Sequence, residues 1–490
     1  MALNQASWGL LATLGVPLVA AALLVAVRPK GRISGWIAGA AAAIPLVAIL
    51  WMVPSLQRGE DPTLYLQWVP MAGISMDLHL DWISLPFALV EAGVTLVAVV
   101  YAWGYHEPDD SSPYLYALLL LFAVGMAGTT LSDGMFLFFI FWEMMLLASC
   151  LLILVWGEGD RRSAVAFKYF VVTHIGSLMV LMAFLMMYNE AGTDRLSVLR
   201  AAETVLPAAQ AQVAIALMLV GFAVKMAVFP VHVWLPDAHT VAPMPVTIML
   251  AAAMLAMGVY GVLRFPMGLF SVEAMLPFAV PMMVVGVVSE IYGALMALAE
   301  EDIKRIVAYS SVSQMGYILY GLGTMTHNGV VGATLQVVFH AIVKALLFMV
   351  LGLVIRATKK RKLSELGGLA RSLPLVTVCA VVGGLAIAGA PPLCLFVSEW
   401  MIFAGGFETA HVALSVITLF GSLLSVAYAL RLMLGLFMGK EKSPVVNTQP
   451  LAMVVPTAFL TLLAIVEGIF PTPLIGWVTE ELALLMGGLW

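Results

Sequence analysis

Long apolar runs recur along the whole 490-residue chain, and they limit its fold more than any other feature. A helix that crosses a bilayer needs roughly 20 predominantly apolar residues, and fourteen such stretches can be marked. Only 10% of the residues are charged, whereas an average soluble domain has about 25%. The sequence therefore predicts an all-α, polytopic membrane protein with about 14 transmembrane helices, in which residues 1–490 form one membrane domain.

The predicted helices cover residues 7–27, 33–54, 81–104, 113–131, 134–156, 163–188, 209–229, 242–265, 274–299, 304–325, 329–356, 373–404, 409–438 and 449–470. Within residues 55–80, apolar and polar side chains alternate (LYLQWV and ISMDLHL), which indicates a small hairpin on the membrane surface. The tail, residues 471–490, is expected to form a short interfacial helix.

Basic residues fall mainly in alternate loops. One set of loops contains Arg28, Lys30, Arg32, Arg161, Arg162, Lys168, Lys304, Arg305, Arg356, Lys359, Lys360, Arg361, Lys362, Arg371, Lys440 and Lys442. The other set contains Arg58, Arg195 and Arg200, with Arg264 at a helix end. Because cytoplasmic loops carry the excess of positive charge, we expect a multi-pass protein of a prokaryotic cytoplasmic (inner) membrane with both termini outside. The first apolar run has no basic residues before it and predicts a membrane helix rather than a cleaved signal peptide.

Four charged residues lie deep inside predicted membrane helices: Glu143, Lys225, Lys344 and Glu399. His340 lies one turn before Lys344 on the same helical face. Opposite signs suggest the pairs Glu143 with Lys225 and Lys344 with Glu399. These are either static ion pairs that hold helices together or a proton relay, in which movement of the acid changes how firmly the lysine holds its proton. We favour the relay because ionisable residues inside membranes are costly and usually functional.

Other polar residues are candidates for supporting or access roles in such a relay: Lys168, His174, His232, Asp237, His239, Glu290 and Lys304. A lone histidine such as His174 fits a hydrogen-bonded packing role equally well. Asp237 fits a helix cap, and Lys304 belongs to a charged segment that is ordinarily a solvated turn. Glu290 lies well inside a predicted helix and needs a partner.

The sequence predicts no cofactor or metal site in this chain. Cys150, Cys379 and Cys394 are scattered through apolar runs without a CxxC or Cys/His spacing, which argues against zinc or iron–sulfur ligation. No glycine-rich nucleotide motif is present. The small net charge of −5, with no basic aromatic patch, gives no indication of a nucleic-acid partner.

Several long motifs occur in order along the chain: FFIFWEMM (138–145), KMAVFPVHVWLPDAHTVAPMPV (225–246), ALAEEDIKRIVAYSSVSQMGYILYGLG (297–323), FHAIVKALLFMVLG (339–352) and PPLCLFVSEW (391–400). Over about residues 70–440 the chain resembles the antiporter-like subunits shared by respiratory complex I, multisubunit cation/proton antiporters and membrane-bound energy-converting hydrogenases. The motif FVSEW resembles the hydrogenase members of this family more than the other members. One span carries Lys225 followed by Pro230, and the predicted helix 373–404 is broken by Gly389, Pro391 and Pro392. Proline-interrupted helices in two halves are typical of inverted-repeat transporters.

The resemblance implies fourteen helices with two inverted five-helix repeats, each containing a broken helix. Residues 113–265 would form the first half-channel, with Glu143 and Lys225, and residues 274–438 the second, with Lys344 and His340. Glu399 would be the exit-side group. The resemblance also implies other membrane subunits and peripheral redox subunits as partners, with iron–sulfur clusters and possibly nickel–iron in those partners.

One position departs from this family. Many members carry a lysine on the eighth span as the bridge between half-channels, where this chain has Ala256 in AAAMLAMGVYGVLRF. Water or other polar groups must then bridge the gap, or this route is not used. Glu290 on the next span is an unusual acid and a candidate for a rearranged axis.

Four functions therefore stay open at the level of sequence. The first is a proton- or sodium-translocating subunit of a redox-driven complex, itself without a redox centre. The second is a subunit of a multisubunit Na⁺/H⁺ antiporter without redox chemistry. The third is a structural spacer whose relay is interrupted at Ala256, and the fourth is a relative coupled to inorganic-carbon uptake. We favour the first.

Overall fold

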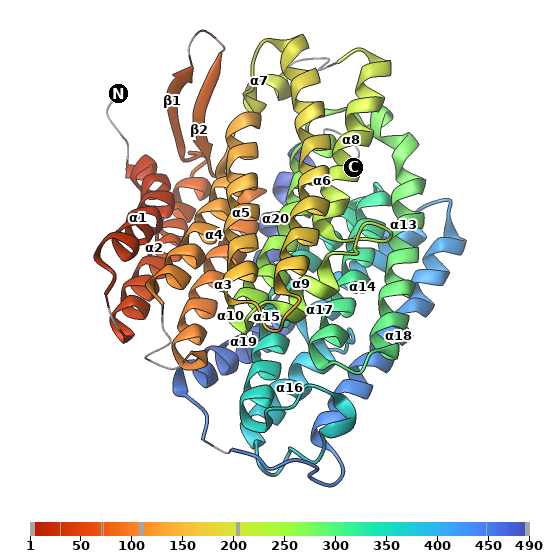
Figure 1. The fold of residues 1–490 in the computed structure, drawn as a ribbon. Coiled ribbons are helices and arrows are strands. Elements are labelled where there is room, and N and C mark those ends of the chain that lie inside the picture. The colour runs from red at the N-terminus through yellow and green to blue at the C-terminus, as the bar shows by residue number, and fades with distance from the viewer. Residues whose placement is uncertain are drawn as a thin grey trace.

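The protein is a helical bundle with one small hairpin (Figure 1), seen in a computed structural model that describes residues 5–29, 31–69, 71, 73–106, 112–201, 206–446 and 448–485. The strands are β1 (Thr63–Val69) and β2 (Ile74–His79). The helices of the first half are α1 (Gln5–Val27), α2 (Arg32–Gln57), α3 (Ser84–Tyr105), α4 (Pro113–Leu131), α5 (Met135–Trp156), α6 (Arg162–Ala191), α7 (Leu196–Ala201), α8 (Ala208–Met226), α9 (Leu235–Val241), α10 (Met244–Met249), the π-helical turn η2 (Leu250–Met254), α11 (Leu255–Arg264) and α12 (Pro266–Leu269). Those of the second half are α13 (Val272–Ala299), α14 (Ile303–Gly323), α15 (His327–Thr358), the 3₁₀ turn η3 (Leu363–Glu365), α16 (Pro374–Ile387), α17 (Cys394–Phe407), α18 (Val412–Phe437), α19 (Leu451–Ile469) and α20 (Thr472–Leu485).

Twelve helices of the described residues are long and apolar enough to cross a membrane, which confirms a multi-pass helical protein. They include Met244–Leu269, which runs through α10, η2, α11 and α12. The helices α14, α16 and α17 fall outside that count, as do the short α7 and α9 and the C-terminal α20. The helix α14 is long but carries many polar residues, and α16 and α17 have 14 residues each.

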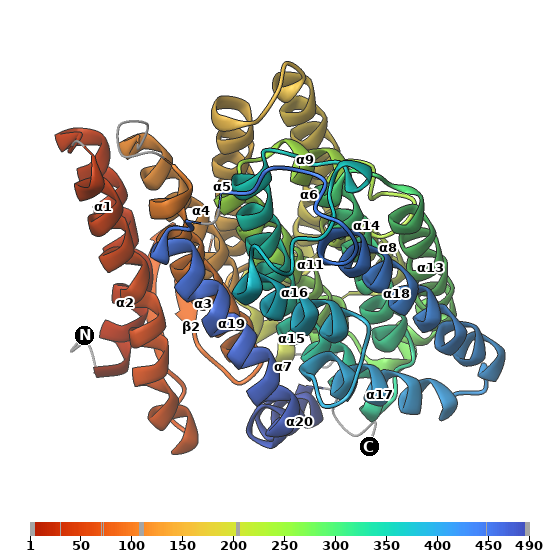
Figure 2. The same cartoon turned by 90° about the horizontal axis from the view of Figure 1, so that it is seen from below.

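Two segments form the centre of the bundle. The helix α15 is buried along almost its whole length, and every residue from Met244 to Arg264 is buried. Figure 2 shows α15 in the middle, with α1 and α2 at one edge and α13 and α18 towards the other. Polar side chains on α15 are therefore enclosed by protein, where backbone and side-chain polar groups must find partners within the fold.

Two predicted helices are interrupted where the sequence places proline. The predicted helix 209–229 ends three residues early, at Met226, because Ala227 adopts a left-handed conformation (φ 56°) before Pro230. The predicted helix 373–404 is split into α16 and α17. Gly389 in this break has φ 67°, and a Cβ atom there would lie 2.1 Å from the Glu399 carboxylate. Only glycine satisfies both requirements, so the break brings a backbone turn directly onto a buried acid.

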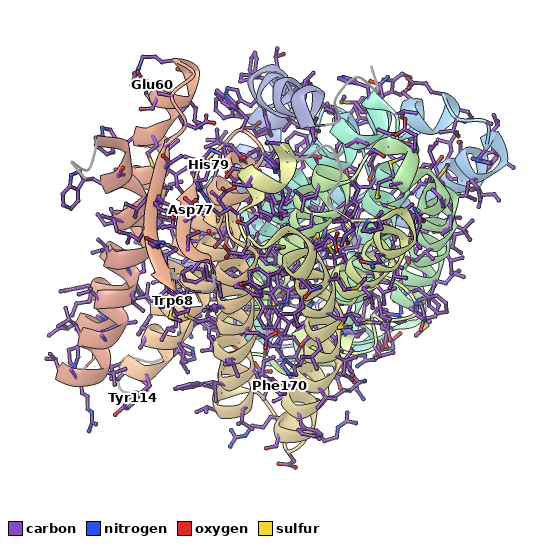
Figure 3. All side chains as sticks on the ribbon, turned by 90° about the horizontal axis from the view of Figure 1, so that it is seen from above. Glu60, Trp68, Asp77, His79, Tyr114 and Phe170 are labelled. Carbon is purple, nitrogen blue, oxygen red and sulfur yellow. The ribbon has the colours of Figure 1, made fainter. Side chains whose placement is uncertain are left out.

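The predicted hairpin is present, and the loops divide into two ends as the basic residues indicated. At the hairpin end, Arg195 pairs with Asp77 of β2 at 2.8 Å, and Figure 3 shows Asp77 and His79 from this side. At the opposite end, Arg361 bridges Glu158 (2.9 Å) and Asp302 (3.0 Å) from two other loops. Each set of alternate loops is therefore joined within itself. The predicted tail helix is α20, and residues 486–490 of that prediction lie outside the described residues.

Candidate functional site

The four predicted intramembrane charges lie inside helices of the bundle, but their contacts differ from the predicted pairs. Glu143 is on α5, Lys225 at the end of α8, Lys344 on α15 and Glu399 on α17. Across the described part of the chain, no ion pair joins Glu143 to Lys225 or Lys344 to Glu399. The prediction of two direct pairs is therefore wrong for the arrangement seen here.

Glu143 binds His174 of α6 instead. Its Oε2 lies 2.9 Å from the histidine Nδ1, and the other carboxylate oxygen has no hydrogen-bond partner among the described residues. Phe170 stacks on the His174 ring with centroids 5.3 Å apart and fixes its plane. His174, predicted as a supporting residue, is thus the direct partner of the acid.

Lys225 lies over the ring of Trp142, with Nζ 5.0 Å from the ring centroid. The side chain is buried, and Nζ makes no hydrogen bond to any described residue. Ser177 accepts a hydrogen bond of 2.9 Å from the Trp142 indole and holds that ring in place. Glu143 is close enough to act on Lys225 electrostatically. An ammonium over an aromatic face gains about 2 kcal/mol when desolvated, far less than a buried charge needs.

Lys344 is held by neutral groups of α14. Its Nζ donates to the Val307 carbonyl at 3.0 Å and to Ser310 Oγ at 2.5 Å. The lysine is completely buried. Neither partner carries a charge, so Lys344 also lacks a counter-ion in contact.

Two histidines lie near Lys344. His340 precedes it by one turn on α15, and His239 comes from α9, on the segment after the break in α8. The charge of Lys344 acts on both rings. Both are completely buried, and the ring nitrogens of both lack hydrogen-bond partners within the described chain. The structure thus brings His239, His340 and Lys344 within electrostatic reach of one another. Ala256, which stands where the resemblance led us to expect a lysine, lies two residues after the π-helical turn η2.

Glu399 faces two glutamines that the sequence analysis did not select. Gln314 of α14 and Gln336 of α15 lie beside its carboxyl group. Gln336 Nε2 donates to Gln314 Oε1 at 2.6 Å, and the Ser398 hydroxyl donates to Gln336 Oε1. Neutral side chains inside apolar helices give a weak sequence signal, although two glutamines in membrane helices are themselves costly unless satisfied.

The remaining predicted residues gather at the basic end. Lys168 binds Asp237 at 2.9 Å, and Arg305 binds the other oxygen of Asp237 at 2.8 Å. Lys304 is buried and donates to the Ala242 carbonyl at 2.8 Å, which ties α14 to the end of α9. This contact replaces the solvated turn expected for Lys304. His232 packs between the rings of Phe229 and Tyr292.

A cluster of two acids and one arginine at the hairpin end was not predicted from the sequence. Arg264, at the end of α11, hydrogen-bonds Asp81 and lies 3.6 Å from Asp133. All three side chains are buried. The Arg264 charge holds the pKa of Asp81 well below its usual range, although burial alone would raise it. These residues are far apart in sequence, so only the fold brings them together.

Aromatic side chains separate this cluster from Lys225. Phe265 packs against Phe138 at 4.7 Å and Phe184 at 4.6 Å between ring centroids. Phe222 packs against Phe265 at 5.9 Å and against Trp142 at 5.6 Å. These four phenylalanines (Phe138, Phe184, Phe222 and Phe265) therefore form an apolar layer that follows Arg264 and reaches Trp142, over which Lys225 lies.

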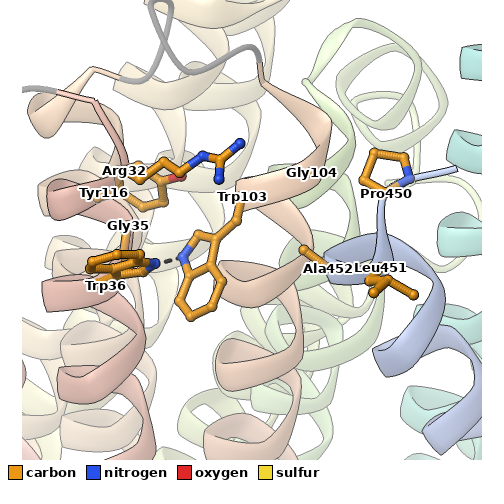
Figure 4. A pocket seen from close by; sticks show the side chains of 9 residues that line it. All are labelled: Arg32, Gly35, Trp36, Trp103, Gly104, Tyr116, Pro450, Leu451 and Ala452. Carbon is orange, nitrogen blue, oxygen red and sulfur yellow. Dashed lines mark hydrogen bonds between the residues drawn. The ribbon is translucent and has the colours of Figure 1, made fainter.

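A cavity of about 270 Å³ lies away from these groups, between α2, α3 and α19 (Figure 4). Arg32, Trp36 and Trp103 line it, and the Trp103 indole donates to the Gly35 carbonyl at 2.8 Å. None of the predicted relay residues lines it. Over the described ranges, no three His, Cys, Asp or Glu side chains gather in a way that would hold a metal ion.

Comparison with known proteins identifies a family model and several relatives that cover most of this chain. The family model described as NADH:quinone oxidoreductase/Mrp antiporter, transmembrane, matches residues 132–425, which contain Glu143, Lys225, Lys344 and Glu399. NAD(P)H-quinone oxidoreductase chain 4 of a Synechococcus strain is 34% identical over 445 residues, covering 88% of this chain and 81% of the relative. NADH-quinone oxidoreductase subunit M of Escherichia coli K12 is 32% identical over 435 residues, covering 86% and 84%.

Solved structures share the whole architecture. A chain of the Mrp complex from Dietzia sp. superposes with a TM-score of 0.88 at 25% identity and covers 98% of both chains. A chain of the archaeal membrane-bound sulfane sulfur reductase gives 0.85 at 28% identity, covering 94% of this chain and 76% of that one. By sequence and by fold, this chain belongs to the NADH:quinone oxidoreductase/Mrp antiporter transmembrane family.

Proposed function

We propose that this chain is the proton-translocating, antiporter-like subunit of a redox-driven membrane complex. The observation that carries the proposal is a series of titratable side chains within the bundle. Lys225, His239, His340, Lys344 and Glu399 are buried, and the half-buried pair Glu143 and His174 lies at the start of the series. Ionisable groups at membrane depth are expensive to keep and mark ion pathways by default.

The same reading accounts for the helix count. Adding α14 and the pair α16–α17, taken as one broken span, to the twelve apolar spans gives fourteen crossings. We assign residues 113–265 to a first half-channel and residues 274–438 to a second, each with its own broken helix. With an even number of crossings and the basic loops on the cytoplasmic side, both termini lie outside a prokaryotic inner membrane.

Glu143 can contact either His174 or Lys225, and this change of partner controls whether Lys225 holds its proton. In this structure His174 holds Glu143, and Lys225 stands over Trp142 with no hydrogen-bond partner among the described residues. A buried ammonium without a partner is costly, so Lys225 readily gives up its proton in this state. Movement of Glu143 from His174 towards Lys225 would stabilise the ammonium and draw a proton in. The layer of four phenylalanines prevents that proton from leaving directly on the hairpin side.

The second half receives the proton through histidine rather than lysine. His239 and His340 lie within electrostatic reach of Lys344, and a neutral imidazole both accepts and donates a proton. Gln314 and Gln336 then lie between this region and Glu399, which we assign as the exit-side carboxyl. Lys168, His232 and Asp237 line the access route at the basic end.

In this proposal, electron transfer takes place in partner subunits and not in this chain. We propose that other membrane subunits flank the chain and that peripheral redox subunits, with iron–sulfur clusters and possibly nickel–iron, drive it. The relatives named as quinone oxidoreductase and sulfane sulfur reductase components support this choice.

The native complex purified through this chain tests the proposal. Iron and labile sulfide, with or without nickel, are the expected content, together with proton uptake into vesicles that follows electron transfer. A metal-free assembly of membrane subunits that exchanges Na⁺ for H⁺ would refute the redox-driven assignment. The chain would then be assigned to a multisubunit Na⁺/H⁺ antiporter, like the chain of the Dietzia Mrp complex that it resembles.

A further inference from the structure

Glu290 occupies a second buried acidic position, apart from the Glu143–Lys225 site. It lies well inside α13 and is completely buried. The neighbouring helices approach it through glycine: a Cβ atom on Gly421 of α18 would lie 1.8 Å from Oε1, and one on Gly316 of α14 would lie 2.4 Å from the Glu290 backbone nitrogen. Gly421 therefore leaves room for the carboxyl group beside α18, and Gly316 lets the backbones of α13 and α14 approach each other closely at Glu290.

Hydroxyl groups surround the carboxyl group. Tyr317 of α14 and Thr418 of α18 lie beside it, and Ser425 lies beside Tyr317. All are buried, and neither Glu290 oxygen nor any of these three hydroxyls completes a hydrogen bond with another described residue. A buried polar group left unsatisfied costs about 1–3 kcal/mol, so four such groups facing one another indicate a site that a small occupant completes.

This group of side chains connects to Glu399. Tyr428 of α18 lies beside both Ser425 and Gln314, and Gln314 lies beside Glu399. The charges of Glu290 and Glu399 act on each other and on Tyr317. A polar line therefore runs from Glu399 through Gln314 and Tyr428 to Ser425, Tyr317 and Glu290, across α14 and α18.

The titratable groups that face Glu290 are acidic or phenolic: Tyr317 and Tyr320 on α14, Glu399 on α17 and Tyr428 on α18. No lysine, arginine or histidine of the described residues acts on its carboxyl group. A buried carboxylate without a cationic partner is strongly disfavoured. The occupant that removes this charge with the least space is a proton.

We propose that Glu290 is a proton-binding carboxyl group at the end of a side branch from Glu399. The hydroxyls of Tyr317, Thr418 and Ser425 align the branch, and the proton moves between Glu399 and Glu290 by hydrogen-bond exchange without entering the Lys225 site. The inference rests on the proposed function, because Glu399 supplies the proton.

Infrared difference spectra and proton translocation of the purified whole complex test this branch. Glu290→Gln is expected to remove one carbonyl band of a protonated carboxylic acid at neutral pH and to lower proton translocation several-fold in the assembled complex. Gly421→Ala, which pushes a methyl group onto the carboxyl, is expected to shift the same band. Glu91→Gln is the matched control, because Glu91 is an equally buried acid on α3, away from the branch. It should leave translocation at the wild-type level.

Two results would overturn the inference. One is a Glu290→Gln complex whose protonated-carboxyl spectrum or whose translocation equals that of the wild type. The other is loss of the Glu290 band when sodium is added at constant pH, which would mean that the site takes Na⁺. If Lys225→Ala stops translocation while Glu290→Gln does not, only the branch fails. If neither variant changes translocation, the proposed function fails as well.

Discussion

Arg264→Met removes a buried basic side chain that forms ion pairs with both Asp81 and Asp133. Methionine fills a similar volume without charge, so the packing around α11 is largely preserved while two buried carboxylates lose their counter-ion. Breaking a buried ion pair in this way costs about 3–5 kcal/mol. His79, 4.0 Å from Asp81, and Arg200, whose charge acts on both carboxylates, offset only part of that loss.

Denaturant unfolding of the purified protein in detergent measures this cost. Arg58→Met is the matched control at the same end of the bundle, because Arg58 pairs with Glu60 and both side chains are exposed, at 57% and 68%. An exposed pair contributes about 0–1 kcal/mol. The double variant Arg264→Met/Asp81→Asn should recover part of the loss, since it removes one of the stranded charges. A free energy of unfolding for Arg264→Met no lower than that of Arg58→Met would refute the reasoning.

Three other predictions concern Glu143, Ser310 and Asp194. Glu143→Gln should abolish proton translocation in vesicles and Glu143→Asp should reduce it less, because only aspartate retains a charge for Lys225; equal activities of the two variants would contradict the switch. Ser310→Ala should lower the free energy of unfolding by about 1–3 kcal/mol, since it removes a hydrogen-bond acceptor from the buried Lys344, whereas Ser422→Ala, exposed on α18, should change it little. Burial raises the pKa of Asp194 to about 6 from the 3.8 that is usual for an aspartate side chain. Between pH 3.8 and about 6, the native state therefore binds more protons than the unfolded state. The free energy of unfolding should therefore fall as the pH rises from about 4 to 6, and Asp194→Asn should flatten that part of the profile. An unchanged profile in the variant would contradict it.

Depth in the membrane was predictable from sequence, but direction around a helix was not. Apolar flanks showed that Glu143 and Lys225 lie inside spans. Successive residues of an α-helix point about 100° apart. Trp142 and Glu143 therefore face different neighbours, and Lys225 meets Trp142 while Glu143 meets His174. Opposite charges at a similar depth in the membrane were therefore not sufficient to predict a direct contact between Glu143 and Lys225.

Helix breaks were predictable because proline and glycine act locally. The interruption around Gly389 and Pro391 appears where the sequence indicated it, and so does the end of α8 before Pro230. The cluster of Asp81, Asp133 and Arg264 was not predictable, because its members come from the segments before α3, before α5 and at the end of α11. Gln314 and Gln336 were missed for another reason. They carry no charge and do not stand out in a search for ionisable groups.

Proton translocation by the assembled complex carrying Lys225→Ala tests the central claim most directly. The complex should be purified and reconstituted in vesicles, with Lys440→Ala as the control, because Lys440 is an exposed residue of the loop after α18. The account predicts that the Lys225→Ala complex assembles with all its subunits and moves no protons during electron transfer, while Lys440→Ala behaves as the wild type. Wild-type translocation by a fully assembled Lys225→Ala complex would contradict the account and leave the chain as a structural spacer.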